Sequence, residues 1–256
     1  MGVVRTDKWL DQYFYQPERI CENLKKFFEP LPATEIYQIL LKKGMYKPNT
    51  LSKNIFLQMT KTKIWERFTL FERKYKRKWT GPDIPIFIFP GRTQILTRRG
   101  KKNGFTFPDK MFLFINDPEA LKDLEALFVH EYHHATRMAM QKKSIEQYTL
   151  LDSLFMEGLA EQTVREIVGE DYVEPILKSY DPKLLVRYWE KYYKNQLNIK
   201  ITDPRHDAFL YGTAFGKPKL GYAIGYFLVE KFREQKPFSI EQSLQMPAEQ
   251  YLNVAK

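Results

Sequence analysis

Cysteine is almost absent from this chain, and so are long apolar runs free of charge. The single cysteine, Cys21, excludes an internal disulfide and is typical of a reducing compartment. The most apolar uncharged stretch, Leu220 to Val229, has ten residues, about half of what a bilayer crossing needs. The first twenty residues carry six charged side chains and no apolar run, which argues against a secretory signal. We therefore expect a cytoplasmic protein with no membrane span.

The composition excludes a disordered or fibrous chain. Hydrophobic residues make up 43% of the 256 residues and charged residues 28%, which is ordinary for a globular protein. A chain of this length can bury a core without disulfides or association. It is long enough for one large domain, or for one domain with a helical annex.

Acidic residues are in the minority. Lysine and arginine number 41 against 31 aspartates and glutamates, so the net charge is +10. The densest basic stretch runs from Lys61 to Lys78, and aromatic residues recur in it at steps of three and four. That spacing predicts a helix with a buried aromatic stripe and solvated cations. The stripe consists of Trp65, Phe68, Phe71, Tyr75 and Trp79. A second basic cluster, at 98–102, has the composition of a solvated turn.

The pattern along the chain predicts helices, then a small sheet, then helices again. Helical periodicity covers residues 18–29, 33–43 with Gly44 as a C-cap, and about 50–79. Short β-rich runs at 84–89, 93–97 and 110–116, separated by glycine and proline, predict a small, mostly antiparallel sheet. Later helices are expected at 117–142, 144–168, 181–196 and 219–234, before a short C-terminal pair.

This order of elements predicts an α+β fold, mostly helical, with a small mixed or antiparallel sheet. We expect residues 1–80 to form an N-terminal helical segment that packs on the main domain. Residues 81–256 are expected to form that domain.

A carboxylate interrupts the apolar stripe of the helix expected at 117–142. Phe128 and Ala135 belong to the stripe, and Glu131 occupies the position between them. Burying a carboxylate is costly unless a cation or a hydrogen-bond donor receives it. His130 and His134 flank Glu131 and, being four residues apart, project from the same face of the helix. The three residues form the motif HExxH.

The next helix has the same anomaly. Leu154 and Val164 lie on its apolar stripe, and the two missing steps of that stripe are Glu157 and Glu161. Two like charges on an apolar face repel each other and lose hydration. A divalent cation between the two helices would offset both costs. Gly158 removes a side chain where two helices would need to approach closely.

These residue types are typical of a zinc site. Catalytic zinc usually has three protein ligands and a water in its fourth tetrahedral position. His130 and His134 supply two nitrogens, and an acid of the second helix supplies the third ligand. Glu131 lies about 100° around the helix from His130, too far to share the metal but suitably placed to contact its water. We expect one Zn²⁺ per chain.

The stretches HEYHH and MEGLAE, the latter from Met156 to Glu161, resemble the glutamate-type zincins, the group of thermolysin and related aminopeptidases. More closely, the chain is similar to a bacterial family of inferred Zn-dependent proteases, in which HExxH precedes EGLAE and a Gly-Tyr-rich helix, here GYAIGYFLVE. The resemblance covers about residues 110–235 and implies a zincin-like metallopeptidase domain with Glu157 as the third ligand. The connection from His134 to Glu157 is longer than in the best-known members, so Glu161 stays a second candidate.

Several residues are weaker candidates for the oxyanion donor that such a reaction needs. Tyr222 and Tyr226, four apart on the late helix, could donate to the oxyanion or be two amphipathic core tyrosines. His206 and Tyr211, in the segment before that helix, are alternatives.

Other polar residues could support the ligands. Glu161 or Asp152 could accept a hydrogen bond from a ligand imidazole, or be acids at the surface or at a helix start. His133, one residue off the histidine pair, is expected to be a neighbour of the ligands. The edge of the strand expected at 110–116 could pair with an extended peptide, or that strand could be buried.

The sequence therefore predicts a zinc-dependent peptidase acting on peptides or proteins. His130, His134 and Glu157 would hold the metal, Glu131 would be the general base, and Tyr222 would stabilise the oxyanion. One alternative is a basic nucleic-acid or anionic-surface binding protein with a structural or vestigial metal site, although we do not expect nucleic acid as a partner. Another is an amidase that acts on a non-protein compound.

Overall fold

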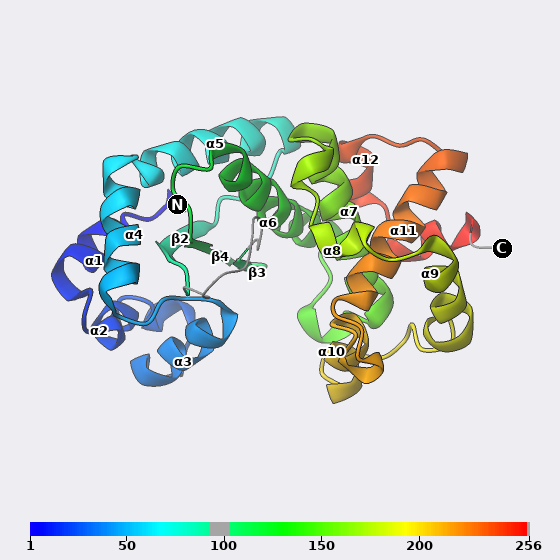
Figure 1. Cartoon of the computed structure of the whole chain (residues 1–256), viewed down its shortest axis with the longest axis horizontal. Helices are drawn as coiled ribbons and strands as arrows, with labels where there is room; N and C mark the ends of the chain where they lie inside the picture. Colours follow the sequence, from blue (N-terminus) through cyan, green and yellow to red (C-terminus); the bar gives the residue numbers. More distant parts are fainter. Residues whose placement is uncertain (93–102, 255–256) are drawn as a thin grey trace. The chain divides into compact units, whose positions relative to one another are not determined.

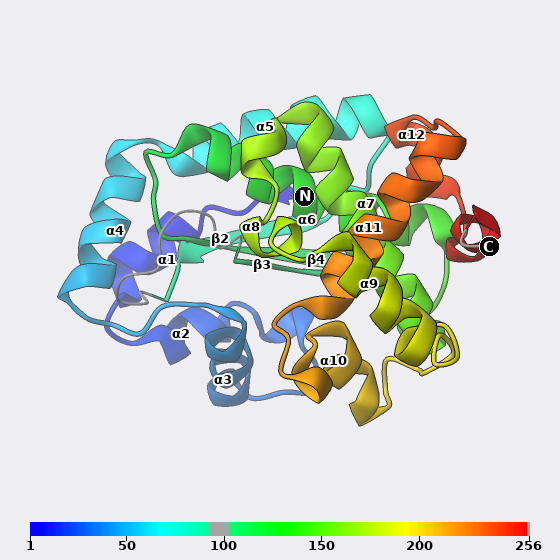
Figure 2. The same cartoon turned by 45° about the vertical axis from the view of Figure 1, so that its right-hand side comes forward.

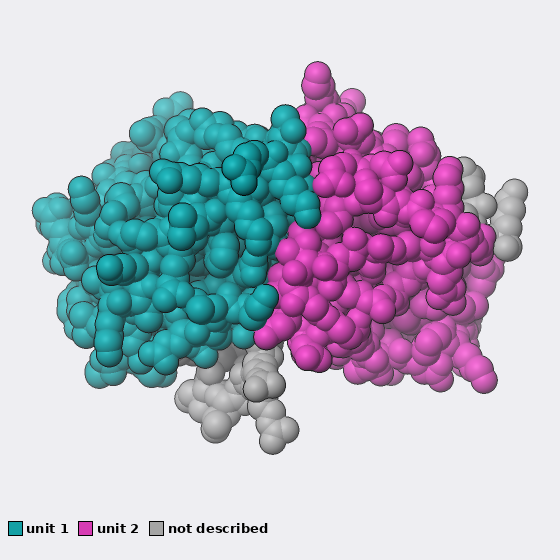
Figure 3. All heavy atoms as spheres, turned by 90° about the horizontal axis from the view of Figure 1, so that it is seen from above, with its two compact units in different colours: residues 1–135 teal, residues 136–256 magenta. Residues whose placement is uncertain are grey.

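The computed structural model of the chain describes residues 1–92 and 103–254. These residues form two compact units, residues 1–135 and residues 136–256 (Figure 3). Helices dominate and a small mixed sheet accompanies them (Figure 1), which confirms the α+β prediction. A boundary after residue 80 stays a prediction.

The first unit contains a four-stranded sheet in the order β1-β2-β4-β3. Its strands are β1 (Gly2–Val3), β2 (Pro85–Pro90), β3 (Gly104–Phe107) and β4 (Lys110–Ile115). β1 and β4 both pair parallel with β2, and only β3 pairs antiparallel, with β4. The expectation of a mostly antiparallel sheet is therefore wrong, because β2 pairs parallel with both of its neighbours and only the hairpin of β3 and β4 is antiparallel. The strand predicted at 93–97 and the basic cluster at 98–102 both lie outside the described residues.

The register divides the sheet into two chemically different faces. Phe87 pairs with Phe112, and Phe112 with Phe105, so these rings project from one face. The phenylalanines on that face are Phe87, Phe89, Phe105, Phe107, Phe112 and Phe114. Trp9 and Phe27 contact it, with ring centroids 6.2 Å and 5.1 Å from that of Phe87. The opposite face carries aliphatic side chains on β2 and β4 and two small residues on β3, and it is described with the site.

Helices of the first unit precede and follow the sheet in sequence. They are α1 (Thr6–Tyr13), α2 (Pro17–Glu22), a short 3-10 turn (Lys25–Phe27), α3 (Ala33–Lys43), α4 (Thr50–Lys61) and α5 (Ile64–Trp79). Both cartoon views show the sheet between α5 on one side and α2 and α3 on the other (Figures 1 and 2). Cys21 is fully buried in α2, and burial raises the pKa of its thiol to about 12. It is therefore a core residue, as expected, and not a reactive thiol.

Local signals located some of these helices better than others. The helix at 33–43 is confirmed to the residue, and Gly44 ends it with a φ of 122°. The single helix expected at 50–79 is wrong, because Lys63 has a φ of 55° and separates α4 from α5. The helix expected at 18–29 is wrong in its C-terminal half, which forms the 3-10 turn. α1 escaped prediction because only two of its residues, Thr6 and Leu10, are buried, and two residues make no stripe.

Most of the predicted aromatic stripe of α5 lies in the core, and Phe71 is only partly buried. Trp65, Phe68, Tyr75 and Trp79 are buried, whereas most cations of the helix are exposed. Phe128, on the long helix at 121–141, packs against this stripe. Its ring centroid lies 6.0 Å from that of Phe68 and 5.9 Å from that of Tyr75. These rings are thus occupied by packing.

The second unit is helical. Its helices are α7 (Leu150–Ile167), α8 (Pro175–Lys178), α9 (Pro182–Tyr188), α10 (Pro204–Leu210), α11 (Leu220–Gln235) and α12 (Ile240–Gln245). α6 (Leu121–Gln141) contains the boundary between the two units. α9 continues as a π-helical turn, Trp189–Tyr193, and a 3-10 segment, Ala248–Val254, ends the described chain.

Most helix predictions for the second unit are confirmed, with shifted starts. α7 begins at Leu150 because Thr149 forms a capping box with Asp152, after a separate 3-10 turn, Ile145–Gln147. α10 was missed, although Asp203 and the proline after it form an N-terminal signal and the Asp203 side chain accepts a hydrogen bond from the Arg205 backbone N–H. None of the helices in the described part of the chain is long and apolar enough to cross a membrane.

α7 and α11 cross at two glycines. A Cβ on Gly158 would lie 2.4 Å from the carbonyl carbon of Gly225, and a Cβ on Gly225 would lie 2.0 Å from the Leu154 oxygen. Both cartoon views show the two helices side by side (Figures 1 and 2). The predicted close helix approach at Gly158 is thereby confirmed, but the helix that approaches is α11 and not the HExxH helix.

Candidate metal centre

The HExxH motif lies in the middle of α6, and all three of its residues are buried. His130 is 7% exposed, Glu131 5% and His134 8%. The two Nε2 atoms lie 3.0 Å apart, and the ring planes are nearly perpendicular, at 81°. Two nitrogens bound tetrahedrally to one zinc at about 2.05 Å are about 3.3 Å apart. The pair is thus close to the spacing that a shared metal requires.

A carboxylate of α7 completes a possible ligand set. His130, His134 and Glu157 each offer one ligand atom, and these atoms all lie within 4.8 Å of one another. Two imidazoles and one carboxylate form a donor set of catalytic zinc sites, which leave the fourth position to water. The residues present therefore suit zinc.

Glu161 has a different environment, although it lies one turn along α7. Its side chain is 2% exposed, and its Oε2 accepts a hydrogen bond from the Glu174 backbone N–H at 2.8 Å. That bond holds the segment before α8. Among the described residues, the group that could hold a metal contains Glu157 and not Glu161.

Glu131 is held against the edge strand of the sheet as described. Its Oε2 accepts a hydrogen bond of 2.6 Å from the Thr106 hydroxyl on β3. Gly104, two residues earlier on the same strand, lies so close that a Cβ there would be 2.4 Å from the Glu131 carboxyl carbon. Neither residue was predicted from the sequence, because their partner is 25 or more positions away and Gly104 lies in a stretch with the composition of a turn.

β4 is not a free strand. It lies between β2 and β3 and pairs with both. The suggestion that its edge could pair with a peptide is therefore wrong, and the alternative of a buried strand is confirmed.

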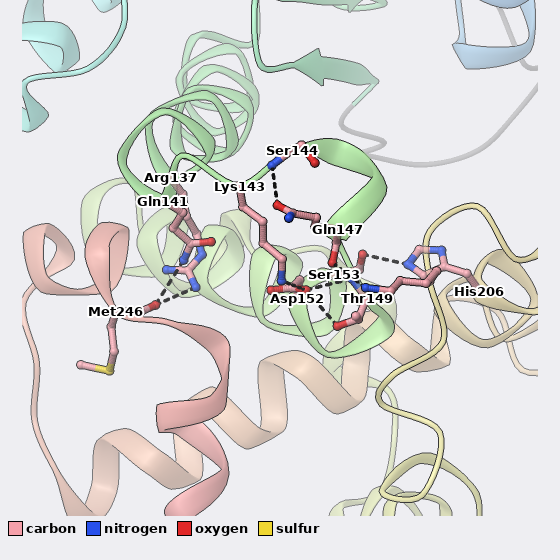
Figure 4. Close-up of polar contacts among 11 residues, drawn as sticks. Arg137, Gln141, Lys143, Ser144, Gln147, Thr149, Asp152, Ser153, His206 and Met246 are labelled. Carbon is pink, nitrogen blue, oxygen red and sulfur yellow. Dashed lines mark hydrogen bonds and ion pairs between the residues drawn. The ribbon is translucent and has the colours of Figure 1, made fainter.

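His133 and Asp152 have structural contacts. His133 is fully buried, and its ring meets that of Trp79 edge-on at 6.3 Å. It is not in the metal-binding group of the described residues. Asp152 accepts hydrogen bonds from Lys143 Nζ at 2.6 Å and from the backbone N–H of Thr149 at 2.8 Å (Figure 4). Asp152 is thus an acid at a helix start, one of the two predicted alternatives.

His206 belongs to a buried chain of hydrogen bonds. Its Nε2 lies 2.9 Å from Ser153 Oγ on α7 (Figure 4), and its Nδ1 lies 3.1 Å from Asp207 Oδ1. The order Ser-His-Asp resembles a nucleophilic triad, but the burial is reversed. His206 is 1% exposed and Ser153 8%, whereas the Asp207 side chain is 70% exposed. A triad needs an accessible serine and a buried acid, so this chain of bonds anchors α10 to α7.

The two tyrosines of α11 differ in exposure. Tyr226 is 4% exposed, and burial raises the pKa of its phenol. Tyr222 is partly exposed; its ring centroid lies 5.9 Å from that of Tyr211, and Lys219 Nζ lies 5.3 Å from the ring. The oxyanion role of Tyr222 stays a prediction, as does that of Tyr211.

Comparison with known proteins agrees with these features. Residues 64–253, more than half of the chain, match the family described as "Predicted Zn-dependent protease (DUF2268)". The chain is 35% identical over 185 residues to "Uncharacterized protein YjaZ" of Bacillus subtilis (strain 168), covering 71% of each chain. It is 26% identical over 137 residues to "Uncharacterized protein YjfC" of the same organism, covering 50% of this chain and 46% of the relative. No solved structure matches the chain significantly. The chain belongs to the family of predicted Zn-dependent proteases.

Proposed function

We propose that the protein is a zinc-dependent peptidase with His130, His134 and Glu157 as the metal ligands. The proposal depends above all on the proximity of one ligand atom from each of these three residues. Support also comes from the family description, which names a Zn-dependent protease. Peptides or proteins are the substrate class that this description favours.

The chemistry that bound zinc supplies at such a site is the activation of a water at neutral pH and the polarisation of a carbonyl. Glu131 accepts the proton of the attacking water and passes it to the departing amine as the peptide bond breaks. Its carboxylate is suited to this task because Thr106 holds one oxygen in place. Tyr222 donates to the developing oxyanion.

The test of this function is the substitution Glu131→Gln, which keeps the shape of the side chain and removes its basicity. We expect the variant to bind one zinc per chain and to lose peptide hydrolysis by at least about 100-fold, the usual contribution of general-base catalysis. Zinc content measured by atomic emission and cleavage of a quenched fluorescent peptide library give the two readouts. Full activity of the variant would contradict the proposal.

A further inference from the structure

We propose that Thr106 and Gly104 on β3 position the carboxylate of Glu131 for proton transfer. The inference rests on the proposed function, in which Glu131 is the general base. It adds two residues of a different element, β3, to the proposed reaction.

The hydroxyl of Thr106 is the first part of this arrangement. It donates to Glu131 Oε2 at 2.6 Å, and it also lies 3.3 Å from the Glu131 backbone oxygen. The shorter contact goes to the carboxylate, and hydrogen bonds to a charged acceptor are short and roughly twice as strong as neutral ones. Thr106 thus restrains one oxygen of the base, and in the proposed reaction the other oxygen, Oε1, accepts the proton.

Gly104 is the second part, and it acts through space and not through backbone freedom. Its φ lies outside the left-handed region, so other residues could adopt its conformation. A Cβ at this position, however, would lie 2.4 Å from Cγ, Cδ and Oε1 of Glu131. Any side chain here would therefore displace the carboxylate that Thr106 holds.

The alternation along β3 explains why these two residues act together. Residues 104 and 106 project from one face of the strand, and Phe105 and Phe107 from the other. The neighbouring strands fill the same face with large side chains, Ile86, Ile88, Met111 and Leu113, all fully buried. Among the described strands that pair on this side of the sheet, β2, β4 and β3, only β3 has small residues on this face, and Glu131 occupies the space beside them. The base is thus held by a strand whose own position is set by pairing with β4, which favours precise placement.

The test compares Thr106→Val, which removes the hydroxyl but keeps the shape, with Thr106→Ser, which keeps the hydroxyl. We expect Thr106→Val to lower kcat about 10-fold with KM and zinc content unchanged, since misplacement of a catalytic group costs rate and not binding. Thr106→Ser should restore kcat to within about 3-fold of the wild type. Gly104→Ala should lower kcat at least as much as Thr106→Val.

A second measurement does not depend on activity. Urea unfolding of the metal-free protein is compared for the wild type, Thr106→Val, Glu131→Ala and the double variant. We expect Thr106→Val to lower the unfolding midpoint in the wild type and to lower it less when Glu131 is already alanine. Additive effects would overturn the contact and the positioning role.

The outcomes separate this inference from the proposed function. If the wild type cleaves peptides and Thr106→Val equals it in kcat, the positioning role is wrong and the proposed function stands. The positioning role is also wrong if Thr106→Ser is as slow as Thr106→Val. If the zinc-loaded wild type cleaves nothing, the proposed function is wrong, and with it the positioning role, even where the unfolding data show coupling.

Discussion

Two acids one helical turn apart on α7 have different surroundings. Glu157 offers a ligand atom near those of His130 and His134, whereas Glu161 accepts the Glu174 backbone N–H. The two acids are four residues apart and so lie on the same stripe of the helix. Periodicity alone therefore left both as candidates for the third metal ligand. The difference comes from the segment before α8, where the backbone N–H of Glu174 donates a hydrogen bond to Glu161 and not to Glu157.

Alanine substitutions at Glu157 and Glu161 should therefore have different effects. Glu157→Ala is expected to lower the zinc content well below one ion per chain, because a donor set of two histidines is incomplete. Glu161→Ala should keep zinc and lose about 1–3 kcal/mol of unfolding free energy, since a buried N–H loses its acceptor. Zinc analysis and urea unfolding measure the two effects. Loss of zinc from Glu161→Ala alone would make Glu161 the ligand.

At the scale of single residues, the sequence predicted what depends on local spacing. His130, Glu131 and His134 follow from one helix, and their burial was expected from the stripe that Glu131 interrupts. The contact of Thr106 could not be predicted, because its partner, Glu131, is 25 positions away and a threonine on a strand has no distinctive pattern. The hydrogen bond between Ser153 and His206 was missed for the same reason.

The crossing of α7 and α11 shows how elements are matched by small residues. Gly158 and Gly225 each lie against the backbone of the other helix. Glycine in a helix interior is otherwise about 1 kcal/mol less favourable than alanine. This cost is offset here because glycine allows the two helix backbones to come into contact.

Substitution of these glycines by alanine should therefore lower the free energy of unfolding, whereas the same substitution inside a helix usually raises it. Without the crossing, Gly225→Ala would stabilise α11 by about 1 kcal/mol. With a Cβ 2.0 Å from the Leu154 oxygen, we expect a loss of at least about 2 kcal/mol from overpacking. Thermal unfolding provides the measurement, and Lys231→Ala on the exposed face of α11 is the control, with a change below about 0.5 kcal/mol. Equal or higher stability of Gly225→Ala would show that the helices can separate without cost.

Element boundaries were predictable where the backbone itself carries the signal. Gly44 ends α3, and Gly169, with a φ of 127°, follows the end of α7. The break between α4 and α5 was hidden, because Lys63 adopts a left-handed conformation that lysine seldom takes. β3 was not predicted either, because its first residue, Gly104, has the composition of a turn. The glycine is there because a side chain at this position would collide with Glu131.

The whole chain combines a basic surface with an aromatic core. The family match begins at residue 64, the first residue of α5. Earlier residues nevertheless belong to the packing of the first unit, because Trp9 and Phe27 cover the phenylalanine face of the sheet. The sequence predicted that the stripe of α5 would be buried, but the two-faced sheet required the pairing of strands, which no local pattern contains.

The net charge of +10 leads to the last prediction, which concerns nucleic acid. Single strands are bound through aromatic side chains on which bases stack, together with a basic groove, but Trp65, Phe68, Tyr75 and Trp79 of α5 are buried. Part of the charge is already paired, as Lys74 with Glu125 at 2.8 Å and Lys76 with Asp83 at 2.7 Å. We therefore expect only non-specific binding, driven by counterion release and weaker than about 1 μM at 150 mM salt.

Fluorescence anisotropy of a labelled 20-mer, single-stranded and duplex, at 20 and 150 mM salt measures this. The affinity should fall steeply with salt and should not depend on sequence, because exposed cations contact phosphates alone. The paired variant Arg73→Gln and Arg77→Gln, on the exposed side of α5, should reduce binding at 20 mM salt and leave peptide hydrolysis unchanged. Nanomolar, sequence-dependent binding at 150 mM would instead favour a nucleic-acid partner, because base contacts and not charge would then supply the free energy.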